Sequence, residues 1–474
     1  MTATIKTDIC IIGAGSGGLS VAAGASQMGA DTVLIERNKM GGDCLNYGCV
    51  PSKALIAAGH TAHLMRHSDR FGIKSVTPQV DFAKVRDHVR GVIAAIEPND
   101  SVERFTGLGV NVISGTAKFI NPNTVEADGT LVQAKRFVIA TGSSAMIPPI
   151  PGLDQVAYLT NETVFELDAQ PDHLIVIGGG PIGSELAQAH RRLGAEVTIV
   201  EMFDFLGKDD PELSEVVRKQ FARDGVDIRL QTTVTAIEQD ADKIIVVTEK
   251  EGQTERIAGS HLLVAAGRTP NLNGLNLKVA RVVCKRNGIQ VDARLRTTNK
   301  KIFAIGDVAG PYQFTHVAGY HASIVIRNAL FKLPAKINYS AVPWVTYTDP
   351  ELAHVGMTEA DAEKAYPQTI NILRWPFHEN DRAQAERETE GMIKIITTKK
   401  GRILGATIVG PHAGELLSPW IMAVGTKQKI GNMARMIAPY PTLGEIGKRV
   451  AGSYYTPSLF SERTRKIVRF LLKF

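Results

Sequence analysis

The sequence has few cysteines and aromatic residues, and it has no long apolar run. Only 4 of its 474 residues are cysteine, and 6% are aromatic. So few cysteines exclude a disulfide-stapled scaffold. No stretch reaches the ~20 apolar residues that span a bilayer. Residues 1–6 contain neither an apolar region nor a cleavage pattern, so we predict a cytoplasmic protein without a secretory signal.

A strong excess of one charge is also missing. The net charge is +6, and Lys and Arg are scattered without the basic and aromatic alternation that follows a nucleic-acid backbone. Nucleic acid is therefore not an expected partner. The hydrophobic fraction of 44% is typical of a globular protein. The length predicts three or four domains.

One pattern occurs twice along the chain. A short apolar run leads into spaced glycines, a helical stretch, a second apolar run and an acid, and the first glycine precedes the acid by 23 residues in both copies. The glycines and acid are Gly13, Gly15, Gly18 and Glu36 in the first copy, and Gly178, Gly180, Gly183 and Glu201 in the second.

This pattern is the fingerprint of a dinucleotide-binding βαβ unit. The first glycine permits the tight turn, the second lets the backbone approach the pyrophosphate, and the third lets helix and strand pack closely. The helix N-terminus faces the phosphates. Two copies predict two bound dinucleotides.

Other apolar runs end in polar or glycine-containing pairs. These pairs are Thr141–Gly142, Gly267–Arg268 and Gly306–Asp307, and a proline-rich linker separates the first from the second repeat. From residue 343 onward, strands at 392–397 and 403–409 alternate with a helix at 414–424, without a nucleotide motif. This last part is predicted to be a separate α+β domain.

Cys44 and Cys49 lie between glycines, shortly after the acid of the first repeat. Half of a zinc site is one interpretation, but no second Cys or His pair has ligand spacing. Two inert core cysteines are another, although a glycine-flanked loop does not suit a strand core. The third is a redox-active pair within one helical turn, with a thiolate whose pKa is lowered near Lys53.

The segment 41–53 resembles the active-site motif of the FAD-dependent pyridine nucleotide–disulfide oxidoreductases, with Asp43 where Thr is usual. The resemblance extends over essentially the whole chain and implies an α/β fold with two Rossmann-like domains and an α+β dimerisation domain. The implied boundaries are 1–150 for the first part of the FAD-binding domain, 151–275 for the NAD(P)-binding domain, 276–341 for the returning FAD segment, and 342–474 for the dimerisation domain with a basic amphipathic tail.

The resemblance also implies roles for individual residues. Cys44 would be the interchange thiol and Cys49 the thiolate against the flavin, beside an ion pair of Lys53 and Glu185. NADH would reduce the flavin, which would reduce the disulfide. The FAD residues implied are Gly13, Gly15, Gly18, Glu36, Gly42, Lys53, Thr141, Gly142, Gly306 and Asp307, and those near the nicotinamide nucleotide are Gly178, Gly180, Gly183, Glu201, Gly267 and Arg268.

Glu201 favours NADH over NADPH. Its carboxylate can accept hydrogen bonds from both ribose hydroxyls but repels a 2′-phosphate. Lys208 is the only cation nearby in the sequence.

The chain departs from the disulfide-reducing members at Tyr440, which stands where they carry a histidine donated by the partner subunit; Glu445 of the same motif is kept. A phenol with a pKa near 10 is a poor base at neutral pH, and an acid such as Glu445 would raise that pKa further. Tyrosine here is similar to mercuric reductases, but the terminal cysteine pair and amino-terminal metal-binding module of those enzymes are missing. The acceptor thus stays open between a disulfide, a small quinone and a soft metal ion such as a mercuric or copper ion.

Two further hypotheses are a redox sensor or membrane-partner subunit with slow turnover, and a flavin carrier with idle cysteines. A homodimer that shares its active site is implied, and no resident metal is expected. Residues 461–474 combine five cations with apolar residues at helical spacing. They predict either a helix packed on the dimer or peripheral contact with the inner face of a membrane.

Overall fold

The computed structural model describes residues 4–474, and its first sheet is mainly parallel. The strand order is β3-β2-β1-β6-β5-β4, and β18 pairs with β6 from the far end of the sequence. Strands β4, β5 and β6 pair antiparallel. The elements up to the linker are β1 (Thr4–Ile12), α1 (Ser16–Gln27), β2 (Thr32–Glu36), α2 (Gly42–Asn46), α3 (Cys49–Arg66), α4 (Phe82–Ile96), α5 (Val102–Gly107), β3 (Val110–Ser114), β4 (Lys118–Asn121), β5 (Thr124–Ala127), β6 (Thr130–Ile139) and β7 (Ser143–Ala145).

A second parallel sheet follows, in the order β10-β9-β8-β14, with an antiparallel sheet β11-β12-β13 beside it. These elements are β8 (His173–Ile177), α6 (Pro181–Leu193), β9 (Glu196–Val200), α7 (Pro211–Asp224), β10 (Asp227–Arg229), β11 (Thr233–Asp240), β12 (Lys243–Lys250), β13 (Gln253–Gly259), β14 (His261–Val264) and β15 (Arg268–Pro270). The chain then returns to the first sheet through β16 (Cys284–Lys285), β17 (Gly288–Ile289), β18 (Ile302–Ala304) and α8 (Thr315–Ala329).

The last part forms a five-stranded antiparallel sheet in the order β19-β20-β23-β22-β21. Its elements are β19 (Pro343–Thr346), β20 (Glu351–Gly356), α9 (Glu359–Ala365), β21 (Ile370–Pro376), α10 (Asp381–Glu386), β22 (Met392–Thr398), β23 (Ile403–Gly410), α11 (Ala413–Leu416), α12 (Ser418–Gly425), α13 (Ile430–Ala434), α14 (Glu445–Ser453), α15 (Thr456–Leu459) and α16 (Glu462–Leu471).

The prediction of one helix at 414–424 was wrong, because the structure has two short helices there. Helix α11 ends at Leu416, and α12 begins at Ser418 with Pro419 in its first turn. Proline is tolerated in a first turn because the N–H it lacks would have no intrahelical partner.

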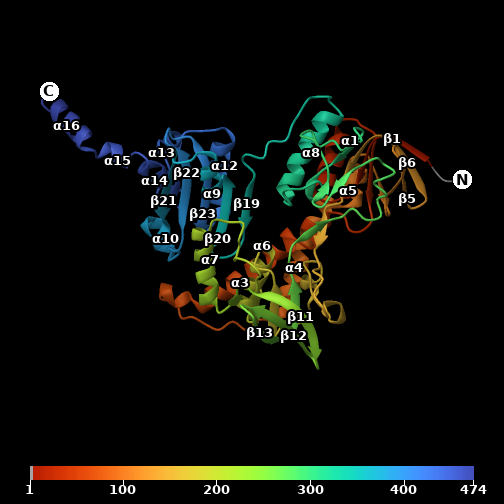
Figure 1. Ribbon diagram of the computed structural model, residues 1–474, viewed down its shortest axis with the longest axis horizontal. Coiled ribbons are helices and arrows are strands. Elements are labelled where there is room, and N and C mark those ends of the chain that lie inside the picture. Colours follow the sequence, from red (N-terminus) through yellow and green to blue (C-terminus); the bar gives the residue numbers. More distant parts are fainter. Residues whose placement is uncertain (1–3) are drawn as a thin grey trace.

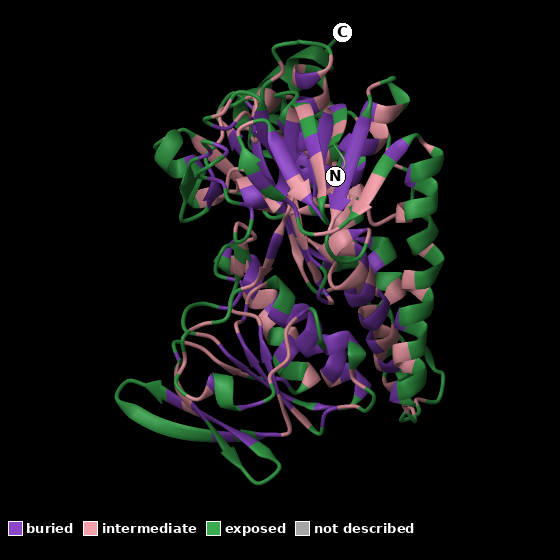
Figure 2. Ribbon diagram, turned by 90° about the vertical axis from the view of Figure 1, so that its right-hand side faces the viewer, coloured by how far each residue is buried: buried purple, intermediate pink, exposed green. Residues whose placement is uncertain are grey.

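Both faces of the first sheet are covered. In β1, Ile9 and Ile11 belong to one apolar cluster, whereas Cys10 and Ile12 belong to another. Successive side chains of a strand point to opposite faces, so a continuous apolar run supplies two cores. Figure 2 shows the buried residues concentrated along the strands and the helix faces against them.

Helix α3 leaves the first sheet and packs against α6 of the second, which brings the first turn of α3 between the two nucleotide-binding units (Figure 1). Helix α8 packs beside α1 on the first sheet. None of the helices described between residues 4 and 474 has the length and apolar composition to cross a membrane.

Candidate active site

The two glycine motifs have the same backbone hydrogen bonds. Glu36 accepts from the N–H of Ala14 at 2.6 Å, and its other oxygen accepts from the N–H of Asn38 at 2.8 Å. In the second copy, Glu201 accepts from Gly179 at 2.6 Å and from Phe203 at 2.8 Å. Each acid therefore closes its own glycine loop, and the repeat seen in the sequence is a repeat of geometry.

The third glycine of each motif is required by close packing. A Cβ atom on Gly18 would lie 1.8 Å from the carbonyl oxygen of Gly13, and one on Gly183 would lie 2.0 Å from that of Gly178. By contrast, a Cβ atom on Gly180 would meet nothing within 4 Å. The third glycines thus permit the close approach of the helix to the start of the loop, whereas the space beside Gly180 is open to a ligand.

A continuous cavity of about 1940 Å³ joins the two motifs. Usual small-molecule pockets measure ~300–1,000 Å³, so this one has room for two nucleotides. Its lining includes most of the residues predicted from the sequence: Gly13, Gly15, Glu36, Gly42, Cys44, Cys49, Lys53, Thr141, Gly142, Gly178, Gly180, Glu185, Glu201, Gly267, Arg268, Gly306 and Asp307. Gly18 and Gly183 lie behind it as packing residues, and Tyr440 and Glu445 are not part of the lining within the described chain.

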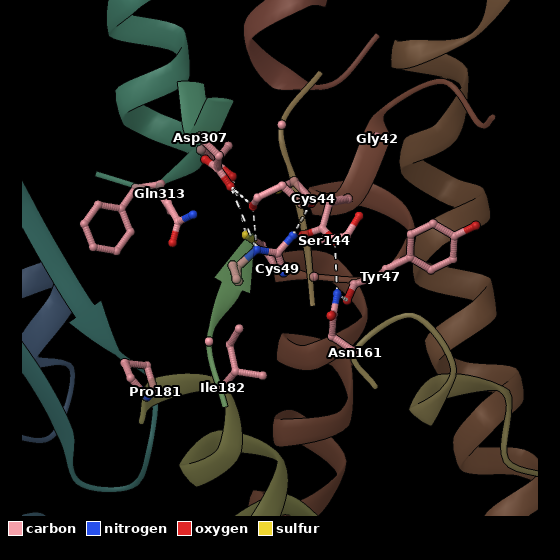
Figure 3. A pocket seen from close by; sticks show the side chains of 18 of the residues that line it. Gly42, Cys44, Tyr47, Cys49, Ser144, Asn161, Pro181, Ile182, Asp307 and Gln313 are labelled. Atoms are coloured by element: carbon pink, nitrogen blue, oxygen red, sulfur yellow. Dashed lines mark hydrogen bonds and ion pairs between the residues drawn. The ribbon is translucent and has the colours of Figure 1, made fainter. Parts of the chain in front are cut away.

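Cys44 and Cys49 lie together in the cavity, but not within one helical turn as predicted. Cys44 is in α2 and Cys49 is the first residue of α3. Tyr47, the C-cap of α2, and Gly48, the N-cap of α3, separate the two helices. Figure 3 shows both side chains in the cavity, with Asp307 on one side and Asn161 on the other. The helix break places Cys49 at a helix N-terminus, where a negative charge is favoured.

The two thiols differ in acidity. A hydrogen bond from Cys44 lowers the pKa of the Cys49 thiol to about 6, with further lowering from Thr315 and Lys53. The Cys49 sulfur lies 3.6 Å from the Thr315 hydroxyl, at the start of α8. The same hydrogen bond, together with burial, raises the pKa of Cys44. Reduced protein therefore holds one thiolate at Cys49 and one thiol at Cys44 at neutral pH.

Lys53 and Glu185 form the ion pair that the resemblance implied, at 2.7 Å. The other Glu185 oxygen accepts from the backbone N–H of Tyr347 at 2.9 Å, and the Lys53 ammonium lies 4.2 Å from the centre of the Tyr347 ring. Sequence patterns did not point to Tyr347. This tyrosine holds the pair from the third domain.

Asp43, the departure from the family motif, has two partners. Its carboxylate is 3.1 Å from the Arg268 guanidinium and accepts from the Asn161 amide at 3.0 Å. Arg268 also donates to the Ser143 hydroxyl, which in turn donates to Asp307 at 2.5 Å. Burial raises the pKa of Asp307. This chain of contacts ties the first turn of α2, which carries Cys44, to the residues on the opposite wall.

Tyr440 is 68% exposed, and its hydroxyl donates to Asp381 at 2.9 Å. This bond raises the pKa of the phenol, and Glu445 adds only a smaller effect. The sequence named Glu445 as the nearby acid, but that carboxylate pairs with Arg449 at 2.9 Å. Asp381 was missed because it is far from Tyr440 in the sequence.

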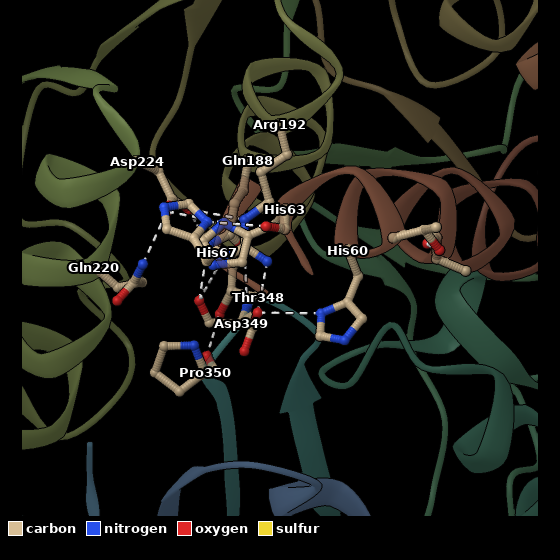
Figure 4. A network of polar contacts seen from close by, with 12 residues as sticks. His60, His63, His67, Gln188, Arg192, Gln220, Asp224, Thr348, Asp349 and Pro350 are labelled. Carbon is tan, nitrogen blue, oxygen red and sulfur yellow. Dashed lines mark hydrogen bonds and ion pairs between the residues drawn. The ribbon is translucent and has the colours of Figure 1, made fainter. Parts of the chain in front are cut away.

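A second polar network lies further along α3 and α6 (Figure 4). Arg192 contacts Asp224 at 2.9 Å and Asp349 at 2.5 Å, and His60 contacts Asp349 at 3.3 Å. Although burial acts in the opposite direction, His60 and Arg192 hold the pKa of Asp349 below its usual range. Burial, aided by Arg192, lowers the pKa of His63 to about 4. The network joins all three domains.

Comparison with known proteins places the chain in a family. Residues 7–322 match the model described as pyridine nucleotide-disulphide oxidoreductase, and residues 342–451 match the dimerisation domain of the same family. The chain belongs to this family and is a flavin-dependent pyridine nucleotide–disulfide oxidoreductase. Its dimerisation domain indicates a homodimer.

Individual relatives carry names that denote different activities. The chain is 39% identical over 442 residues to a mercuric reductase of Bacillus cereus, covering 92% of this chain and 70% of that protein. It is 33% identical to a dihydrolipoyl dehydrogenase of Geobacillus stearothermophilus, covering 94% and 96%. The Cu(II) complex of the HOCl-induced flavoprotein disulfide reductase RclA from Escherichia coli shares its fold, with a TM-score of 0.85, 27% identity and coverage of 94% and 99%.

The residues present fit FAD and a pyridine nucleotide, which the family uses. Gly15 and Gly180 are the N-cap residues of α1 and α6, and neither helix has a side-chain cap or an acid in its first turn. Both glycines line the cavity, so the free N–H groups of the first turns are available to phosphate oxygens.

Proposed function

We propose that this enzyme oxidises NADH and delivers the electrons through the Cys44–Cys49 pair to a small acceptor. The observation that carries the proposal is the Cys49 thiol, whose pKa is lowered to about 6, in the same cavity as both nucleotide motifs. Bound flavin would take hydride from the nicotinamide and reduce the disulfide. Cys49 would hold its negative charge toward the flavin, and Cys44 would meet the acceptor.

The surrounding residues would bind and orient. Gly13, Gly15 and Glu36 would hold the adenosine half of FAD, and Asp307 would hold the ribityl and phosphate side. Lys53 and Glu185 would fix the contact between flavin and nicotinamide; their geometry is set by the bond from Tyr347 to Glu185. Only Glu185 is strongly buried, at 8% exposure, so Lys53 keeps access to the cavity.

An anaerobic NADH titration of the FAD-loaded protein tests this route. We expect a broad charge-transfer absorbance after two electrons, because a thiolate then lies against oxidised flavin. The band should be absent from Cys49→Ser, which lacks the thiolate. In Cys44→Ser, NADH should not generate the band, because that variant has no disulfide to reduce. Simple bleaching of the flavin by the first two electrons would show that the cysteines are not in the path.

NADH is proposed over NADPH because Glu201 lines the second half of the cavity. Its carboxylate lies at the end of β9 and would repel a 2′-phosphate. Glu201→Gln should raise the NADPH to NADH ratio of kcat/KM by about tenfold, equivalent to ~1.4 kcal/mol. Glu36→Gln, at the matching place in the FAD motif, is the control and should leave that ratio unchanged. An unchanged ratio in Glu201→Gln would remove this assignment.

Two acceptor classes remain to be distinguished: a disulfide of the dihydrolipoamide type, and a mercuric or copper ion. The Tyr440–Asp381 hydrogen bond favours the metal ion, since it raises the pKa of a phenol already too high for a base at neutral pH. A disulfide substrate needs proton transfer to its leaving thiol, and a positioned acid–base group contributes ~10²–10⁴-fold. A metal ion that binds to the thiolates does not need this proton transfer.

Steady-state assays with lipoamide and with Hg(II) or Cu(II) rank the two classes. For a metal-ion reductase, Tyr440→His should raise lipoamide turnover, by on the order of 10²-fold, and should not raise metal-ion turnover. Tyr440→Phe is the control, since it removes the hydroxyl without adding a base. Rapid lipoamide turnover by the wild-type protein would instead favour the disulfide.

A further inference from the structure

The C-terminal tail, residues 456–474, lies beyond the part of the chain that matches the dimerisation domain. The family match ends at residue 451, and the tail contains α15 and α16. Figure 1 shows both helices extending away from α13 and α14. No residue of α16 is buried. The single chain therefore provides no packing surface for it, so the expected packed helix is not formed within one subunit.

Helix α16 has its own start and stop signals. The Ser461 hydroxyl accepts from the N–H of Thr464, Glu462 occupies the first turn, and Arg469 the last. These charges match the helix dipole. A helix of ten residues is nevertheless marginal in water by itself. Such a helix gains stability from a surface on which its apolar side can rest.

The two sides of α16 differ in chemistry. At about 100° per residue, Arg465, Lys466 and Arg469 fall on one side of α16, and Ile467, Phe470 and Leu471 fall on the other, where Arg463 of the first turn also lies. Phe470 is 59% exposed and Leu471 is 61% exposed. Exposed apolar side chains that are concentrated in this way mark an interaction surface.

We propose that α16 docks this enzyme on an anionic lipid surface. The apolar side would enter the boundary between headgroups and acyl chains, while the cations contact the lipid phosphates. Five cations and one acid in residues 462–474 give the charge complementarity. This inference concerns a segment outside the catalytic cavity and does not rest on the choice of acceptor.

A lipid surface fits this helix better than a protein partner does. The cores of protein interfaces are depleted in charged residues, and Lys in particular is rare there. In α16, basic residues lie beside the apolar side from the first turn to the last. Long basic side chains can bury their stems and keep their charged ends at the headgroups, so both sides of the helix are satisfied at once.

Vesicle sedimentation of the full-length holoenzyme tests the proposal. The probes are vesicles of phosphatidylcholine alone and of phosphatidylcholine mixed with phosphatidylglycerol. The wild-type protein should sediment with the mixed vesicles only, and salt should release it because screening weakens the charge attraction. The variant with Arg465→Gln, Lys466→Gln and Arg469→Gln should bind roughly 10²-fold more weakly.

The matched control replaces three exposed lysines elsewhere, Lys250, Lys285 and Lys400, with Gln and should bind like the wild type. Equal sedimentation of the tail variant and the control would overturn the proposal, as would wild-type binding to neutral vesicles alone. Light scattering gives the remaining outcome: if Phe470→Ser with Leu471→Ser splits the dimer, the apolar side belongs to the subunit interface and the lipid assignment is wrong.

Discussion

Removal of the Cys44 sulfur should make Cys49 a weaker acid. The hydrogen bond between the two is the largest cause that lowers the pKa of Cys49 from 9.0 to about 6. With that pKa, about nine-tenths of the Cys49 side chains are thiolate at pH 7, against about one-hundredth for an ordinary thiol. A hydrogen bond to a charged group contributes about 1.5–3 kcal/mol, or about 1–2 pKa units. Because Cys49 is exposed, the lower end applies, and Cys44→Ala should raise the pKa by about one unit.

The assay is alkylation of the reduced protein by iodoacetamide across pH, with Cys49 followed by mass spectrometry. The midpoint is the readout, because a thiolate of higher pKa is also a stronger nucleophile and the rate at one pH mixes both effects. Cys284→Ala, which removes an exposed thiol outside the cavity, should keep the wild-type midpoint. A midpoint in Cys44→Ala that stays at the wild-type value would refute the assigned cause.

Three further outcomes follow from the site and its surroundings. Lys53→Met leaves the buried Glu185 carboxylate without its cation and should lower the free energy of unfolding in urea by about 1–3 kcal/mol; unchanged stability would show that water replaces the ammonium. Gly18→Ala forces a Cβ atom onto a carbonyl and should reduce FAD content after purification, whereas Gly183→Ala should keep FAD and raise the KM for NADH; equal effects of both would contradict two separate sites. His190 is buried, and burial lowers its pKa from 6.5 to about 4, so its neutral form is favoured in the folded state and stability is lost as pH falls from about 6.5 to 4; His190→Leu should flatten that part of the thermal-unfolding profile, and an unaltered slope would assign the loss to other groups.

The glycine motifs were predictable because their requirements are local. A carbonyl oxygen 1.8 Å from a would-be Cβ atom leaves no alternative to Gly18, whatever the rest of the chain does. The second apolar run of the second repeat was likewise recognisable, and it forms β9 (Glu196–Val200) in the structure. The equal spacing of glycines and acid identified both dinucleotide-binding units, because both units need the same backbone geometry.

Contacts between distant segments were not predictable in this way. The bond from Tyr347 to Glu185 joins residues 162 positions apart, and no periodicity announces it. The acid that binds Tyr440 was assigned to its own motif, whereas the structure supplies Asp381 from α10. The break between Cys44 and Cys49 was missed because spacing does not show that Tyr47 ends one helix before Gly48 caps the next.

The contact between Lys53, Glu185 and Tyr347 also sets an order of events during synthesis. Lys53 leaves the ribosome early, whereas Tyr347 leaves it only after about 300 further residues have been synthesised. Until the third domain has emerged, the carboxylate beside Lys53 lacks its second hydrogen bond, and the wall of the cavity formed by Trp344 and Tyr347 does not exist. A nascent chain would thus carry both cysteines long before it could form a complete electron-transfer site.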